Sequence, residues 1–466
     1  MSSTKDNGLV RGILEKFLFI GFTVQIGFGI AWIIKNIGYV QLFGESAENV
    51  AVSGTFVCSI YTGVLYPAFL LLVRAAGMAI GFPWFSCVYI MQLAVAVLSV
   101  WVLLKAFSER KHSNLFYLWA SLAITTFPFI IQNHLAILGN SFTMSFTLLE
   151  IAFTKRSWGT KSLIDGKEFS FDMGRVCLFW MLAALMEWDY LFIGAIPVIA
   201  LLGRSVYILV KKNPKSAFFP VIIALLFGVL IVGLYKLTEN KNEKALPTPS
   251  IEVALFDRTA WTAFIKTRER RNPYLIEQVG DEILEEAMNH RENVKLVIEP
   301  EIEKNLGKKA ARKFYYYMSK DALLSYGTDI IHESWVDLAG YLMPPVVTGM
   351  LYDEDTFVSF APRNYDIMKR NAPVLTKWFV DYSILWFGIA LMEGCILWLL
   401  RFFEAMRDKK KIKASAVIIF AVMCIAIAVR NTFLGCGMYD HKLSGAVCVL
   451  WIMLMVLSVK AREKTK

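Results

Sequence analysis

The chain has 466 residues, of which 56% are hydrophobic and 14% aromatic, and its mean hydropathy is +0.50. Its apolar residues are gathered in blocks of roughly 17–28 residues, the length that crosses a hydrocarbon core of about 30 Å, which excludes an ordinary soluble domain. The net charge of +10 belongs to short loops and tails, because residues 238–378 hold 19 Lys and Arg against 22 Asp and Glu. This distribution indicates membrane topology and excludes a nucleic-acid-binding surface as its cause.

The apolar blocks predict an all-α polytopic membrane protein with about ten transmembrane helices. The expected spans are Phe17–Ile34, Phe56–Val73, Phe82–Phe107, Leu115–Ile131, Ile137–Phe153, Cys177–Leu202, Phe218–Leu237, Tyr382–Phe403, Ala416–Val429 and Leu443–Val459. They divide the chain into a transmembrane module at residues 1–237, a polar insert at residues 238–378 and C-terminal transmembrane helices at residues 379–466. The seven cysteines lie in or beside the apolar blocks, so neither a disulfide framework nor a CxxC metal site is expected.

The first loop between spans, GESAENVAVSG at residues 44–54, places Glu45 and Glu48 beside the membrane. The two carboxylates are three residues apart, so on a helix they would share a face. One interpretation is a general base or metal ligand at the membrane surface. The alternative is a solvated connector in which Ser46 or Asn49 caps a helix.

The predicted span Cys177–Leu202 is interrupted by Glu187-Trp188-Asp189-Tyr190. A charged residue inside a span costs about 2.5–3.5 kcal/mol on insertion scales. Glu187 and Asp189 therefore indicate either a cavity or an interfacial turn between two half-helices. An unbroken span places the N-terminus inside, but it also places the basic loops 108–112 and 155–161 outside, against the positive-inside tendency. A broken span reverses both assignments.

The insert alternates charged and apolar residues at helical spacing from Glu277 to Gly327, which predicts soluble helices with breaks at Gly280, Pro300 and Gly307. The basic stretches 203–215, 407–413 and 460–466 are expected to be cytoplasmic. The insert is then expected to be extracytoplasmic.

The turn between the last two predicted spans is also polar. Arg430 ends the ninth span, and Asp440, His441 and Lys442 open the tenth. Their cationic side chains could bind a phosphate or pyrophosphate, whereas the alternative is that they anchor the helix ends at the membrane surface. A zinc protease is not expected, because His332-Glu333 lacks the second histidine of the H-E-x-x-H motif.

The order of a first span, an acidic outer loop and a second span resembles the GT-C superfamily of polytopic membrane glycosyltransferases. The stretches that carry the resemblance lie within Gly12–Leu237 and are GESAENV, SIYTGVLYPAFLLLVRAAG, PWFSCVYIMQLAVAVLSVWVLLKAF and LAALMEWDYLFIGAIPVIALL. The superfamily usually has an adjacent Asp-Glu pair in the loop, whereas Glu45 and Glu48 are three residues apart. The stretch NAPVLTKWFVDYSILWF resembles uncharacterised membrane proteins of Gram-positive bacteria.

The resemblance implies an inverting glycosyltransferase of the bacterial plasma membrane. Such an enzyme takes a sugar from a polyprenyl-phosphate-linked donor in the bilayer and transfers it to an extracytoplasmic acceptor, such as an envelope glycan, a glycolipid or a protein. The acidic loop then faces outward and the N-terminus is cytoplasmic. No resident cofactor is implied, and dependence on a divalent metal stays open.

The residues that this function would use are assigned by chemistry. Glu45 would act as the base, with Glu48 as the alternate. The lipid phosphate would be held by Arg430, His441 and Lys442, and Glu187, Asp189 and Asp440 would border the cavity or hairpin. Two other functions stay open: a transporter or flippase of a lipid-linked envelope precursor, and a non-catalytic membrane assembly protein whose insert binds a partner.

Overall fold

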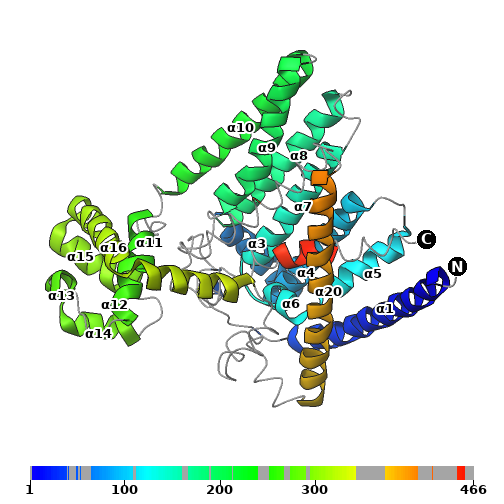
Figure 1. Cartoon of the computed structure of the whole chain (residues 1–466), viewed down its shortest axis with the longest axis horizontal. Coiled ribbons are helices and arrows are strands. Elements are labelled where there is room, and N and C mark those ends of the chain that lie inside the picture. The colour runs from blue at the N-terminus through cyan, green and yellow to red at the C-terminus, as the bar shows by residue number, and fades with distance from the viewer. Residues whose placement is uncertain are drawn as a thin grey trace. The chain divides into compact units, whose positions relative to one another are not determined.

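The computed structural model describes residues 3–38, 40, 49–50, 53, 64–108, 112–159, 166–187, 190–211, 214–239, 251–266, 273–289, 294–342, 373–407, 422 and 449–456. Every element within these ranges is a helix, which confirms the all-α prediction. The chain forms two compact units, a larger one with α1 to α10 and α20 and a smaller one with α11 to α16 (Figure 1). The three regions expected from the sequence, 1–237, 238–378 and 379–466, stay a prediction.

The larger unit is a bundle of long helices. Its elements are α1 (Ser3–Asn36), α3 (Leu65–Ile80), α4 (Trp84–Phe107), α5 (Asn114–Thr125), α6 (Pro128–His134), α7 (Asn140–Gly159), α8 (Gly166–Met186), α9 (Tyr190–Lys211), α10 (Pro214–Glu239) and α20 (Pro373–Arg407). Helices α7, α8, α9 and α10 follow one another along the chain and pack side by side (Figure 1).

Three of these helices are long and apolar enough to cross a membrane, over Phe19–Asn36, Trp84–Phe107 and Phe169–Met186. Shorter apolar stretches occupy Leu65–Ile80, Asn114–Thr125, Tyr190–Val206, Phe218–Leu234 and Leu385–Leu400. Large apolar side chains such as Phe192 and Val229 are more than 70% exposed on this unit, as expected of a surface that lipid covers. The larger unit therefore has the character of a membrane-associated bundle, although the described residues contain three long spans and not about ten. The predicted span Ala416–Val429, except residue 422, and parts of Phe56–Val73 and Leu443–Val459 lie outside the described residues.

The predicted span Leu115–Ile131 is two helices, because Pro128 divides it. Proline has no backbone N–H and disfavours helical geometry in the residue before it. Phe127 accordingly adopts φ −61° and ψ 140°, between α5 and α6. The next predicted span, Ile137–Phe153, overlaps α7 from Asn140 onward.

Helix α7 lies at the centre of the larger unit and differs from a lipid-facing span. It packs against α4, α8 and α9, and nearly all of its side chains from Asn140 to Thr154 are buried. Several of those side chains are hydroxyls, and Thr143, Ser145, Thr147 and Thr154 each donate to the backbone carbonyl four residues earlier, at 2.7–3.1 Å. Bonds of this kind satisfy a buried hydroxyl without a partner from another helix.

The predicted span Cys177–Leu202 is also two helices. Helix α8 ends at Met186 and α9 begins at Tyr190, so the break expected around Glu187 is present. The two helices have 21 and 22 residues and pack against each other, so they are longer than the half-helices that were expected. Helix α8 starts before the predicted span, because residues 166–176 are also helical, and α9 ends after it, because residues 203–211 are also helical. Both extensions are more polar than the central apolar block.

The smaller unit is a compact group of short helices around one long helix. Its elements are α11 (Ile251–Phe256), the π-helix η2 (Asp257–Trp261), α12 (Thr262–Lys266), α13 (Pro273–Val279), α14 (Asp281–Asn289), the π-helix η3 (Val294–Ile298), α15 (Glu299–Leu306) and α16 (Lys308–Leu342). Phe256 and Tyr315 are fully buried in its core with ring centroids 5.2 Å apart. Burial of side chains of this size stabilises a fold by about 1.5–3 kcal/mol each.

All three predicted breaks of the insert coincide with helix ends. Gly280 (φ 86°) separates α13 from α14, and Gly307 (φ 75°) separates α15 from α16. Both backbone conformations lie in the left-handed half of the map, which glycine adopts at little cost. Pro300 lies in the first turn of α15, where its missing N–H would have no helical partner in any case.

Asp257 in η2 gives the smaller unit a pH-dependent stability. Burial raises the pKa of its carboxyl to about 7, although the neighbouring Arg258 guanidinium acts in the opposite direction. Because the folded chain holds this proton up to about pH 7 and the unfolded chain releases it near pH 4, the unit loses stability as pH rises between these values.

Asp257→Asn should remove that loss. At pH 8 we expect the variant to be more stable on the order of 2 kcal/mol, and at pH 4 we expect no difference. Hydrogen–deuterium exchange of peptides covering residues 251–266, corrected for intrinsic rates, would measure this. Asp281→Asn, at an exposed position of α14, is the matched control. Equal protection of wild type and Asp257→Asn at pH 8 would contradict the prediction.

Candidate functional site

Most of the residues expected to form the site lie outside the described residues. These are Glu45, Glu48, Asp189, Arg430, Asp440, His441 and Lys442. Glu187 is described: it directly follows α8, it is 9% exposed, and its backbone N–H donates to the carbonyl of Ala183 at 3.0 Å. The described part of the expected site therefore consists of Glu187 and the residues near Glu45 and Glu48 that the structure describes.

Buried polar side chains gather near Glu187, where α6 joins α7. We call this group, comprising Tyr66, Gln92, His134, Ser141 and Glu187, the polar junction. Side-chain Nε2 of Gln92 donates to the backbone carbonyls of His134 at 3.0 Å and Ala136 at 2.8 Å, and its Oε1 accepts from the Tyr66 hydroxyl at 3.2 Å. Nδ1 of His134 lies 2.8 Å from the Ser141 hydroxyl.

The polar junction forms because the segment between α6 and α7 is buried without being helical. Backbone carbonyls in such a segment need hydrogen-bond donors from elsewhere, and the amide of Gln92 supplies them. Gly139 lies beside two of these side chains, because a Cβ atom there would be in van der Waals contact with Cγ of Glu187 at 3.8 Å and Cγ of Tyr66 at 3.7 Å. Nε2 of His134 is buried without a hydrogen-bond partner among the described residues.

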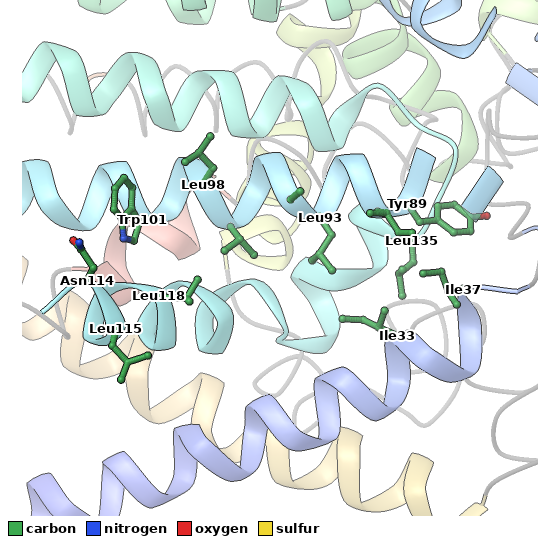
Figure 2. A pocket seen from close by; sticks show the side chains of 13 residues that line it. Ile33, Ile37, Tyr89, Leu93, Leu98, Trp101, Asn114, Leu115, Leu118 and Leu135 are labelled. Carbon is green, nitrogen blue, oxygen red and sulfur yellow. The ribbon is translucent and has the colours of Figure 1, made fainter. Parts of the chain in front are cut away.

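An apolar groove of about 750 Å³ runs along α4, and at one end its lining includes Leu135, the residue next to His134 of the polar junction (Figure 2). It is lined by Ile33, Ile37, Tyr89, Ile90, Leu93, Ala94, Val97, Leu98, Trp101, Asn114, Leu115, Leu118 and Leu135. Ile90, Leu98 and Leu115 are 47–75% exposed, so the groove opens at the surface of the bundle. In Figure 2, Ile37, Tyr89 and Leu135 lie at one end, and Trp101 and Asn114 lie at the other.

The described residues on either side of Glu45 and Glu48 are tied to the same end of the groove. Before the loop, the carbonyl of Ile37 accepts a hydrogen bond from the Ser86 hydroxyl at 2.6 Å. In the second half of the loop, after Glu48, Nδ2 of Asn49 donates to the carbonyl of Ile137 at 3.0 Å, and the Ser53 hydroxyl accepts from Nη1 of Arg74 at 2.9 Å. Both ends of the loop are thus fixed close to the junction between α6 and α7.

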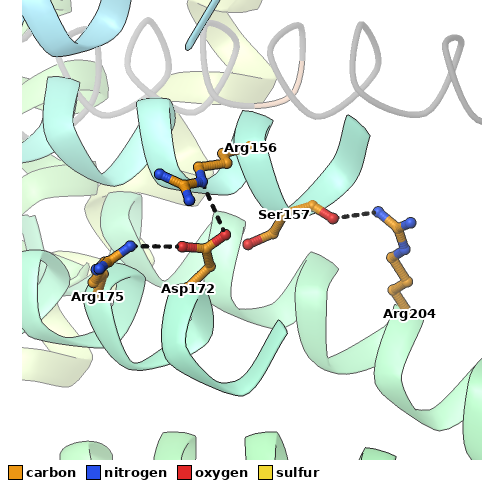
Figure 3. A network of polar contacts seen from close by, with 5 residues as sticks. All are labelled: Arg156, Ser157, Asp172, Arg175 and Arg204. Atoms are coloured by element: carbon orange, nitrogen blue, oxygen red, sulfur yellow. Dashed lines mark hydrogen bonds and ion pairs between the residues drawn. The ribbon is translucent and has the colours of Figure 1, made fainter. Parts of the chain in front are cut away.

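The opposite end of the bundle is basic (Figure 3). Arg156 near the end of α7 lies 3.5 Å from Asp172 near the start of α8, and Arg175 bonds the other oxygen of Asp172 at 3.0 Å. Arg204 of α9 donates to the backbone carbonyl of Ser157 at 3.1 Å. At the same end, Nζ of Lys155 lies 5.8 Å from the centre of the Phe107 ring, which closes α4.

The helix ends that flank the basic loops 108–112 and 155–161 lie at the basic end of the bundle, opposite the ends that flank the acidic loop. One feature that differs from the expected path is that α8 and α9 are separate helices that pack against each other.

Glu150 is a candidate that the sequence analysis missed. It lies in the middle of α7 with 0% exposure, and neither carboxyl oxygen has a hydrogen-bond partner among the described residues. A Cβ atom at Gly194 of α9 would lie 3.1 Å from its Oε2. The available signal was a single acidic residue within the predicted span Ile137–Phe153, because a carboxyl inside a span is costly and often functional. Arg74, Gln92 and His134 were missed because nothing in their local spacing marks them.

Within the described ranges, no group of three or more His, Cys, Asp and Glu side chains is arranged to hold a metal ion. No protein family, no curated protein and no solved structure matches the chain. The function is therefore inferred from the chemistry of the groove, the polar junction and the acidic loop.

Proposed function

We propose that the chain is a membrane glycosyltransferase that transfers a sugar, with inversion, from a polyprenyl-phosphate-linked donor to an extracytoplasmic acceptor such as an envelope glycan, a glycolipid or a protein. The observation that carries this proposal is the apolar groove with one end next to the polar junction, beside both anchors of the acidic loop. A ligand with one apolar chain and one polar head has the chemistry that such a site recognises.

The groove suits an isoprenoid chain. Between Tyr89 and Trp101 of α4 it extends roughly 18 Å at 1.5 Å per residue, which is about half the thickness of a hydrocarbon core. Its lining is almost entirely aliphatic and aromatic, and its open side would face lipid in a membrane-associated bundle. A donor could therefore enter sideways from the bilayer, which suits an enzyme that works where nucleotide sugars are absent.

The acidic loop is close enough to act at the head of such a donor. Glu45 is four residues before Asn49, so the extended chain limits the separation of their Cα atoms to roughly 14 Å. In the proposed reaction Glu45, or Glu48 in its place, removes the proton of an acceptor hydroxyl. The hydroxyl oxygen then bonds to the anomeric carbon as the bond from that carbon to the phosphate oxygen breaks, and the lipid phosphate leaves with the electron pair.

Cationic side chains would stabilise the departing phosphate, where negative charge develops. Arg430, His441 and Lys442 remain the proposed phosphate ligands. Arg74 joins them as a candidate, because it is bonded to Ser53, five residues after Glu48 in the acidic loop. Glu187 borders the head-binding region, and Asp189 and Asp440 are proposed to lie near it.

The basic end of the bundle supports an orientation. Lys and Arg are retained on the cytoplasmic side, so the basic end is proposed to be cytoplasmic and the polar junction extracytoplasmic. Two residues separate α9 from α10, which runs antiparallel to it, so the chain is proposed to enter the insert from the side of the polar junction. The proposed location is therefore the bacterial plasma membrane, with the insert outside the cell.

Glu150 favours the second candidate function, a transporter or flippase of a lipid-linked envelope precursor. A carboxyl inside the bundle with no described partner is a typical component of a proton-linked pathway. The glycosyltransferase is preferred because the groove lies next to the polar junction at the bundle's end and does not include Glu150 in its lining. A non-catalytic assembly role for the insert has no specific observation in its favour.

The orientation predicts that the insert is accessible from outside the cell. Ser325 is exposed on α16, and a cysteine at this position should react with a membrane-impermeant maleimide on intact cells. The background is a chain with its seven native cysteines replaced by serine or alanine. A cysteine introduced at Lys105, at the basic end, should react only after permeabilisation. Labelling of the cysteine at position 105 on intact cells, with labelling at position 325 only after permeabilisation, would contradict the proposed orientation.

The groove predicts that its width controls use of long-chain donors. Leu93→Trp places a larger side chain in the groove, and we expect KM for a long polyprenyl-phosphate sugar to rise at least about tenfold, because part of the chain's apolar contact is lost. KM for a donor with two isoprene units should change little. Met91→Trp is the control, since Met91 is 44% exposed on the same helix and does not line the groove. Equal effects of both variants on both donors would contradict the role of the groove.

The acidic loop predicts loss of turnover when its base is removed. Glu45→Gln keeps the shape of the side chain without its basicity and should lower kcat by about 10²–10⁴-fold with donor binding retained. The assay is release of radiolabelled sugar from a panel of decaprenyl-phosphate sugars by purified protein in nanodiscs with bacterial membrane fragments as acceptor. Glu277→Gln, at an exposed position of α13, is the control.

The outcome of that assay separates the candidate functions. If Glu48→Gln abolishes turnover and Glu45→Gln does not, the two roles are exchanged. If neither variant changes turnover, the loop is a connector and the proposed base is wrong. If no donor is consumed and Glu150→Gln instead abolishes movement of the labelled lipid across a vesicle membrane, the transporter is correct.

A further inference from the structure

We propose that the arginine cluster at the basic end, formed by Arg156, Arg175 and Arg204, binds the phosphate headgroup of an anionic membrane phospholipid. The three guanidinium groups come from three different helices, α7, α8 and α9, and surround Ser157 and Asp172 (Figure 3). This site lies at the opposite end of the bundle from the polar junction, so the inference does not depend on the proposed reaction.

The charges of the cluster are not balanced within it. Asp172 is the single carboxylate in the network, and it is shared by Arg156 and Arg175. Arg204 is bonded to a neutral backbone carbonyl. Three guanidinium groups therefore gather around one carboxylate, and an anion that approaches them is attracted by this local positive charge.

The arginines are held in place and yet remain accessible. The side chains of Arg156 and Arg175 are 57% and 41% exposed, although both contact the buried Asp172. Arg175 lies 5.2 Å from the centre of the Phe153 ring, and Arg204 lies 4.9 Å from that of Trp158. These rings and bonds fix the planes of the guanidinium groups, which matters because arginine binds phosphate through paired N–H groups in a fixed plane.

The surface beside the cluster is apolar, which selects a lipid over a soluble anion. Phe171, Arg175 and Leu178 are spaced at i, i+4 and i+7 on one face of α8. Phe171 is 72% exposed and Leu178 is 38% exposed, and Val206 beside Arg204 on α9 is 52% exposed. A free phosphate would use the arginines alone. A phospholipid would also lay its acyl chain along Leu178 and Val206.

The depth of the cluster fits the headgroup level of a bilayer. The apolar stretch of α8 that can cross a membrane starts at Phe169, and Arg175 lies six residues further along, roughly 9 Å into the helix. An arginine at that depth extends its head back toward the boundary between lipid and water. Anionic lipid headgroups occupy this boundary and attract basic side chains near helix ends.

The test measures lipid retained by the purified full-length chain in a neutral detergent, by native mass spectrometry. Phosphatidylglycerol and phosphatidylcholine with the same acyl chains are compared, and we expect the anionic lipid to be retained at least about tenfold more strongly. The double variant Arg175→Gln/Arg204→Gln should weaken binding of phosphatidylglycerol by roughly 10- to 30-fold. The control variant Arg312→Gln/Lys313→Gln removes two exposed charges from α16 and should leave binding unchanged.

A second variant and a competition experiment complete the test. Arg175→Lys/Arg204→Lys keeps the charges if the glutamine variant fails to fold, and it should still weaken binding, because lysine lacks the paired N–H geometry. Glycerol phosphate, which has the headgroup without acyl chains, should not compete at equal concentration. Equal retention of the two phospholipids, equal effects of the cluster and control variants, or full competition by glycerol phosphate would each overturn the proposal.

Discussion

The larger unit depends on how the buried link between α6 and α7 satisfies its backbone. This link leaves the helix while surrounded by protein, and in a membrane-associated bundle no water replaces its missing hydrogen bonds. The side-chain amide of Gln92 supplies donors to the carbonyls of His134 and Ala136, and Asn49 supplies one to Ile137. The same contacts bring α3, α4 and the end of the acidic loop together. A polar site at this end of the bundle is therefore a consequence of satisfying the backbone.

The central position of α7 explains why its composition is unusual. A helix that faces lipid must be apolar, whereas a helix enclosed by α4, α8 and α9 can carry hydroxyls that bond to its own backbone. Glu150 is the exception, because a carboxyl cannot be satisfied in this way, and an ionised carboxylate without a partner is strongly disfavoured in such a place. Glu150 is therefore the buried polar side chain of α7 that packing and backbone bonding do not explain.

The sequence predicted the features that local chemistry determines. The breaks at Gly280, Pro300 and Gly307, the interruption at Glu187 and the all-α class follow from residue types at single positions. The half-helices predicted on either side of Glu187 are shorter than α8 and α9, because hydropathy marks only the apolar part of a helix that continues into polar residues. The bonds of Gln92 join residues about 40 positions apart, and no pattern along the chain encodes such a pairing. The expected positions of Glu45 and Arg430 remain predictions.

Cationic side chains lie near both ends of the groove. The contacts that each of them already makes favour one end as the site for a lipid-linked phosphate. At the end formed by Trp101 and Asn114, Nζ of Lys105 lies 3.6 Å from the centre of the Trp101 ring, so this ammonium group is already held by the aromatic face. On the side of the polar junction, Arg74 is bonded to a single neutral hydroxyl in the described residues. A phosphate there would gain a charge-assisted bond without breaking an existing cation–π contact. We therefore propose that the head of the donor lies beside the acidic loop, with its chain directed toward Trp101.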